Sequence, residues 1–151
     1  MVIDRKKMYK PPWSTTDNQG GWVEVTDRCD LACPGCYRKS LEGDRSPDDI
    51  KKEILECQAT TNCDTMVIAG GEPLLYPHIL EVVRFIALHG MKPLILSNGT
   101  SFTEDLAGEL KAAGLKRIHL HIDSRQPRDG WEGKDEKELN RLRDYYANML
   151  S

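Results

Sequence analysis

Short apolar runs alternate with amphipathic stretches along most of this 151-residue chain. Four runs rich in β-branched residues predict strands at about residues 22–26, 65–69, 93–97 and 116–124, and helical spacing follows each of them. Strands that alternate with helices are typical of βα units around a parallel sheet. The pattern therefore predicts an α/β fold with about four βα units and a mostly parallel sheet.

Capping signals mark where the helices should begin. The expected caps or first residues of the four helices are Ser46, Pro77, Thr103 and about Asp135. In the first helix, Ile50, Ile54 and Leu55 should face the core. Each strand and the helix after it would then form one βα unit.

The apolar and polar residues of the fourth strand alternate. Ile118, Leu120 and Ile122 share one face, whereas His119, His121 and Asp123 share the other. The apolar face should meet helices. The two histidines are candidates to bind substrate or donate a proton, but histidines that only hydrogen-bond within the sheet would show the same pattern.

Composition limits the class of protein. With 39% hydrophobic and 30% charged residues, the chain should fold, and residues 22–151 are expected to form one domain behind an irregular arm at residues 1–21. A net charge of −3 gives no broad basic surface for nucleic acid. No stretch has the apolar length of a signal sequence or a membrane span, so we expect a cytoplasmic protein without a membrane partner.

Three of the five cysteines lie close together in the segment TDRCDLACPGCY. Cys29, Cys33 and Cys36 follow the pattern Cys-x3-Cys-x2-Cys directly after the first predicted strand. Three thiolates can hold a [4Fe-4S] cube and leave one iron open, whereas structural zinc requires four closed ligands. Cys57 and Cys63 form no second Cys-x2-Cys pair, and no role follows for them.

This cysteine loop, followed one βα unit later by Gly70-Gly71-Glu72-Pro73, resembles the radical S-adenosylmethionine (SAM) superfamily. The resemblance implies a partial (βα) barrel, with the [4Fe-4S] cluster on Cys29, Cys33 and Cys36 and with SAM on the open iron. It implies reductive cleavage of SAM to a 5'-deoxyadenosyl radical that takes a hydrogen from an unidentified, small-molecule substrate. A reduced protein of the ferredoxin or flavodoxin type would supply the electron.

The resemblance also implies SAM-binding residues at the carboxyl ends of the strands. In the superfamily, the positions of Gly70, Gly71, Glu72 and Pro73 meet the SAM amino group. The positions of Ser97, Asn98, Asp123 and Ser124 contact the methionine carboxylate and the ribose hydroxyls. The superfamily often has an aromatic residue just before the third cysteine, where this chain has Gly35 and places Tyr37 one step after. Each of these segments would also suit an ordinary turn.

A full superfamily core has six βα units, of which this sequence supplies four. It is a shortened member, or the N-terminal part of a longer protein, or its barrel is completed by a partner chain. The fourth strand would then be an edge, which the last helix or a partner should protect. Two other functions remain open. One is a small activating enzyme that installs a glycyl radical on anaerobic ribonucleotide reductase, and the other is a truncated domain that binds cluster and SAM without turnover.

Overall fold

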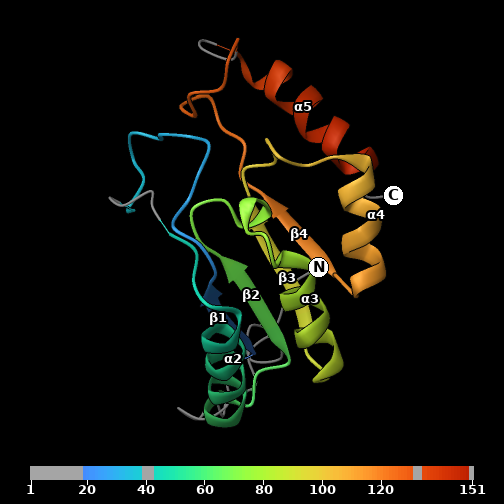
Figure 1. Ribbon diagram of the computed structural model, residues 1–151. Helices are drawn as coiled ribbons and strands as arrows, with labels where there is room; N and C mark the ends of the chain where they lie inside the picture. Colours follow the sequence, from blue (N-terminus) through green and yellow to red (C-terminus); the bar gives the residue numbers. More distant parts are fainter. Residues whose placement is uncertain (1–18, 39–42, 131–133, 150–151) are drawn as a thin grey trace, which may run out of the picture.

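A single parallel sheet organises the molecule (Figure 1). The computed structural model describes residues 19–38, 43–130 and 134–149. The strands are β1 (Gly20–Glu24), β2 (Thr65–Ala69), β3 (Lys92–Ser97) and β4 (Arg117–Leu120), and they lie in the order β1-β2-β3-β4. All three pairings are parallel. The predicted α/β architecture with four βα units is confirmed.

Three helices connect successive strands and lie on the same face of the sheet (Figure 1). They are α2 (Pro47–Thr61), α3 (Ile79–Leu88) and α4 (Glu104–Ala113). Helices on one face only are what a partial barrel requires, whereas a doubly wound sheet carries helices on both faces. None of the helices in the described part of the chain has the length and hydrophobicity needed to span a bilayer.

The core lies between these helices and the strands. It includes the fully buried side chains of Val23, Met66, Ile68, Ile95, Ile54, Val83 and Leu110. Burying each such side chain stabilises the fold by about 1.5–3 kcal/mol. Leu55, which was expected in the core, is 40% exposed, because it lies one residue past the buried Ile54 and therefore about 100° further around the helix.

Two predicted strand boundaries are wrong. β1 begins at Gly20 rather than Trp22, so the two glycines assigned to the irregular arm belong to the sheet. A Cβ on Gly21 would lie 2.6 Å from the terminal methyl of Met66, so a larger residue there would require that side chain to shift. β4 ends at Leu120, because the chain then turns toward the side chain of Gln126, which donates to the His121 carbonyl at 2.7 Å.

The helix starts agree with the sequence in part. Thr103 caps α4 through its side chain as predicted. Ser46 occupies the cap position of α2, but its side chain makes no capping hydrogen bond. Pro77 does not open α3, which begins at Ile79, because the 3-10 helix η1 (Pro73–Leu75) and a turn precede it.

The last helix, α5 (Glu136–Met149), lies at the carboxyl end of the sheet beyond α4 (Figure 1). Its Tyr146 ring packs edge-on against Phe102, with ring centroids 6.3 Å apart, and its Arg143 donates to the Ile122 carbonyl at 2.7 Å. Within the described residues, α5 therefore covers the loops after β3 and β4. The last helix or a partner chain was expected to protect the edge of β4. The contacts of α5 are with these loops, and protection by a partner chain stays a prediction.

Candidate iron-sulfur and SAM site

The predicted site segments meet at one edge of the sheet. In a parallel sheet all strands end at the same edge, and ligands bind there. The cysteine loop follows β1, Gly70–Pro73 follow β2, Ser97–Asn98 close β3, and Asp123–Ser124 follow β4. The structure thus brings together segments that are about a hundred residues apart in sequence.

The two glycines after β2 pack directly against the start of the cysteine loop. The backbone N–H of Gly71 donates to the Thr26 carbonyl at 2.8 Å, and that of Glu72 donates to the Arg28 carbonyl at 2.7 Å. A Cβ on Gly71 would collide with the Arg28 carbonyl oxygen. The glycines are therefore required for contact between two protein segments, and not only for the approach of a ligand.

The three loop cysteines carry free thiols. Cys29 and Cys33 are partly buried, whereas Cys36 is exposed and its N–H donates to the Cys33 carbonyl at 3.0 Å. Burial raises the pKa of Cys29 and of Cys33, and the charge of Cys36 adds to the effect on Cys33. Among the described residues, no three metal-ligating side chains converge on one point as they would around a single ion. A cube instead takes its thiolates on separate irons, which fits three thiols spread along one loop.

The other two cysteines lie at the opposite end of β1. The sulfurs of Cys57 and Cys63 each lie 2.9 Å from the position that a Cβ on Gly21 would occupy. Gly21 is near the start of β1, whereas the cysteine loop follows its end. Neither thiol can therefore supply a fourth ligand to this loop, which argues against a four-cysteine zinc site.

The Glu72 carboxylate points into the protein. It is fully buried and accepts hydrogen bonds from the Ser97 hydroxyl at 2.8 Å and from the Asn98 N–H at 2.7 Å. Burial raises the pKa of Glu72, and these hydrogen bonds oppose the rise. The side chains of Glu72 and Ser97 thus bond to each other across the ends of β2 and β3. Their backbone carbonyls are engaged as well, since the Leu75 N–H donates to Glu72 and the His121 N–H donates to Ser97.

Asp30, which the sequence did not single out, joins the cysteine loop to the end of β3. Its carboxylate accepts hydrogen bonds from the Asn98 amide at 2.8 Å, from the Thr100 hydroxyl, and from the Ser101 hydroxyl at 3.2 Å. Burial alone would raise the pKa of Asp30, but the bonds from Thr100 and Asn98 lower it. No local pattern around Asp30 signals a partner about seventy residues away.

Arg128 is buried, although charged side chains in loops are usually exposed. Its guanidinium donates to the Asn98 carbonyl and, at 2.9 Å, to the Gln126 side-chain oxygen. No ion pair between described residues includes it. Arg125 in the same loop is exposed, and Trp131 lies outside the described residues. Arg128 therefore connects the loop after β4 to the loop after β3.

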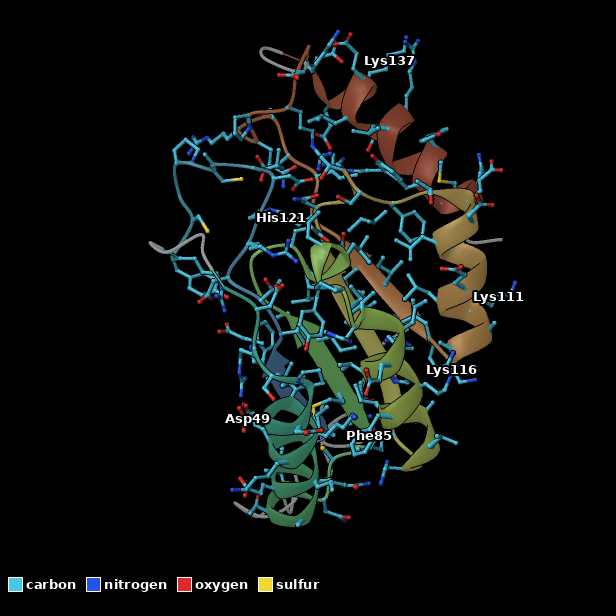
Figure 2. The ribbon with its side chains drawn as sticks, viewed as in Figure 1. Asp49, Phe85, Lys111, Lys116, His121 and Lys137 are labelled. Atoms are coloured by element: carbon cyan, nitrogen blue, oxygen red, sulfur yellow. The ribbon has the colours of Figure 1, made fainter. Side chains whose placement is uncertain are left out.

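The polar face of the last strand ends in a histidine–aspartate pair. The His121 Nε2 and Asp123 Oδ2 atoms are 2.9 Å apart, and Figure 2 shows His121 at the carboxyl end of β4. Asp123 also accepts from the Arg125 N–H at 2.7 Å. His119 is exposed between the partly buried Ile118 and Leu120, so the predicted alternation holds over β4, whereas His121 and Asp123 lie past its end. His121 and Ser124 are also exposed. These side chains remain available to a ligand.

Tyr37 is 69% exposed and is tied to β1 through its hydroxyl, which donates to Glu24 at 2.9 Å. Burial of the hydroxyl and the Glu24 carboxylate raise the pKa of Tyr37 to about 12. Arg38 pairs with the same Glu24 and with Asp27. These contacts anchor the end of the cysteine loop on the strand that precedes it.

Comparison with known proteins identifies the family. Residues 23–148 match the family described as the Radical SAM superfamily. The chain belongs to the radical SAM superfamily, whose members use a [4Fe-4S] cluster and SAM.

The chain is 30% identical over 108 residues to the probable GTP 3',8-cyclase of Methanothermobacter marburgensis, covering 70% of this chain and 35% of that protein. It is 32% identical over 104 residues to the AdoMet-dependent heme synthase of Methanosarcina barkeri, covering 66% and 30%. The chain spans about a third of the length of these relatives.

Solved structures confirm the radical SAM fold. Streptococcus suis SuiB bound to the precursor peptide SuiA matches with a TM-score of 0.61 and 18% identity, over 72% of this chain and 25% of that chain. The enzyme anSMEcpe with bound AdoMet and a peptide matches with a TM-score of 0.62 and 16% identity, over 86% and 40%. At such low identity, these matches bear on the fold alone. The expected partial barrel is confirmed.

Proposed function

We propose that this radical SAM domain binds one [4Fe-4S] cluster through Cys29, Cys33 and Cys36 and cleaves SAM reductively. The observation that carries the proposal is the separation of the five cysteines, with three on one loop at the carboxyl edge and two beside Gly21 at the far end of β1. Three thiolates leave one iron open for SAM. With SAM on that iron, the bound cluster supplies the electron that cleaves the sulfonium.

The remaining polar groups of this edge are proposed to hold SAM. The amino group is placed at the backbone of Gly70–Pro73, and the carboxylate beside Ser97 and Asn98 at the end of β3. The Ser97 hydroxyl and the Asn98 N–H already donate to Glu72, so binding the carboxylate there would require one of them to change partner. Asp123 and Ser124 are accessible after β4, and suit the ribose hydroxyls. Tyr37 is the aromatic residue of the loop that is available to the adenine. Exposure of Cys36 favours electron delivery there by a reduced ferredoxin or flavodoxin.

A small molecule is the proposed substrate, from which the 5'-deoxyadenosyl radical takes a hydrogen. The relatives support this class, since one is named for GTP and another for heme synthesis. The exposed pair of His121 and Asp123 provides polar groups for such a substrate. The domain proposed to do this comprises residues 22–151 together with Gly20 and Gly21, which begin β1, in a cytoplasmic protein. The free edge of β4 would be open to further βα units or a partner chain.

Anaerobic reconstitution with iron and sulfide tests the proposal. The wild type should bind about four irons, show the absorbance of a cluster, and form 5'-deoxyadenosine from SAM under a strong reductant. Cys33→Ala should lose iron and form no 5'-deoxyadenosine. Cys57→Ala is the matched control, because it also removes one thiol but lies at the far end of β1, and it should behave as the wild type.

Three results would count against this function. A wild-type protein that takes up zinc in place of iron, or that is EPR-silent after reduction, does not carry the cluster. Equal loss of iron in Cys33→Ala and Cys57→Ala would mean that the two groups of cysteines are not distinct.

A further inference from the structure

Asn98 lies where four segments of the site meet. Its backbone N–H donates to Glu72 at 2.7 Å, and its carbonyl accepts from Arg128. Its side-chain oxygen accepts from the Thr100 N–H at 2.8 Å, and its side-chain nitrogen donates to Asp30 at 2.8 Å. The residue is buried, and its backbone and side chain are both fixed in place.

These partners determine which way the amide points. The Thr100 N–H is only a donor, so it must face the amide oxygen of Asn98. The Asp30 carboxylate is only an acceptor when ionised, so it must face the amide nitrogen. A flipped amide would place oxygen against the carboxylate and nitrogen against an N–H. The nitrogen therefore has a second hydrogen left to donate.

That second N–H is directed at the sulfur of Cys29. The Asn98 Nδ2 atom lies 3.8 Å from the Cys29 Sγ atom, and the Leu31 N–H donates to the same sulfur at 3.5 Å. In the described part of the chain, no side-chain amide approaches Cys33 or Cys36 in this way. The Cys29 sulfur thus differs from the other two, because it accepts from Leu31 of its own loop and from Asn98 at the end of β3.

Hydrogen bonds to the sulfur ligands help to set the potential of an iron-sulfur cluster, because they stabilise the negative charge that reduction adds. We propose that Asn98 is a positioning residue whose amide raises the reduction potential of the cluster at its Cys29 corner. This inference rests on the proposed function. The redox step concerned is the addition of one electron to the oxidised cluster, with dithionite as the reductant in the test.

The test compares midpoint potentials of reconstituted proteins by EPR-monitored redox titration. Asn98→Leu keeps similar volume and removes the amide donors without adding charge. Asn98→Asp keeps an oxygen for Thr100 but adds a negative charge beside Asp30, so it should lower the potential at least as much. Both should shift the reduction equilibrium about tenfold toward the oxidised cluster, which is ~59 mV for a one-electron couple. Ser101→Ala is the matched control, because it removes a hydroxyl that donates to Asp30 at 3.2 Å but leaves the hydrogen bonds of Asn98 in place, and it should keep the wild-type potential.

The outcomes separate this inference from the function on which it rests. Failure of the wild type to bind a cluster overturns the proposed function, and the inference with it. If the wild type is loaded but both Asn98 variants titrate at its potential, only the inference is overturned. The same holds if Ser101→Ala shifts as much as Asn98→Leu. It also holds if neither Asn98 variant retains iron, because Asn98 would then hold the loop rather than tune the cluster.

Discussion

Glu72 lies buried between the ends of β2 and β3, where its carboxylate accepts hydrogen bonds from Ser97, Asn98 and Leu74. The sequence identified the position through the Gly-Gly-Glu-Pro segment, but a side chain at the end of a strand can point outward to a ligand or inward to its neighbours. The inward direction is set at the end of β3, where the Ser97 hydroxyl and the Asn98 N–H face the Glu72 carboxylate and donate to it. The residue thus shapes the edge on which SAM is proposed to bind.

Glu72→Gln tests this arrangement. The glutamine would place an NH2 group against the Asn98 N–H or the Ser97 and Leu74 donors, leaving a buried donor unsatisfied at a cost of about 1–3 kcal/mol. We expect the free energy of unfolding, measured by urea denaturation, to fall by that amount. Glu109→Gln on the exposed side of α4 is the control and should change it by less than about 0.5 kcal/mol. Wild-type stability of Glu72→Gln would show that the carboxylate is not required there.

Among the elements, the junction between β2 and the cysteine loop is the most constrained. The N–H groups of Gly71 and Glu72 donate to the carbonyls of Thr26 and Arg28. The first residues of the cysteine loop therefore stay hydrogen-bonded to the segment after β2, just as β1 is bonded to β2. Strand periodicity predicted β1 and β2 separately. It could not predict this contact, because hydrogen bonds between a loop and a turn forty residues apart leave no periodic signal in either segment.

Gly71→Ala should disrupt that junction. Its Cβ meets the Arg28 carbonyl oxygen, which is backbone and cannot move aside without breaking the two hydrogen bonds. We expect a lower thermal midpoint and a loss of iron retention after reconstitution. Gly108→Ala is the matched control, since Gly108 lies in α4 with open space around it, and alanine should stabilise the helix by up to about 1 kcal/mol. An iron-loaded, stable Gly71→Ala protein would contradict the assigned packing.

Across the whole molecule, Arg128 and α5 connect the last βα unit to the others. Arg128 donates to the Asn98 carbonyl, and Tyr146 packs against Phe102, so the loop after β4 and the last helix both rest on the loop after β3. Charged residues in loops are usually exposed, so the burial of Arg128 is not a local property of the sequence. Its burial depends on acceptors that come from other elements.

Arg128→Met should loosen this end of the molecule selectively. Because the Asn98 carbonyl loses its donor and the Tyr146 hydroxyl of α5 loses its interaction with the guanidinium, we expect faster hydrogen exchange in α5 and in the loop after β4, and unchanged exchange in α2 and β1. Arg125→Met, in the same loop but exposed, is the control and should leave all these rates unchanged. If the hydrogen-exchange rates of α5 equal those of the wild type in both variants, Arg128 does not hold α5 in place.

The sequence by itself determined the four βα units, the parallel sheet and the three-cysteine loop, because strand and helix periodicity and cysteine spacing are local properties. The tertiary structure alone decided which groups meet. It sets Cys57 and Cys63 apart from the loop, turns Glu72 inward, buries Arg128 and aims the Asn98 amide at Cys29. Such contacts join residues far apart in the chain, and their geometry exists only once the strands have paired.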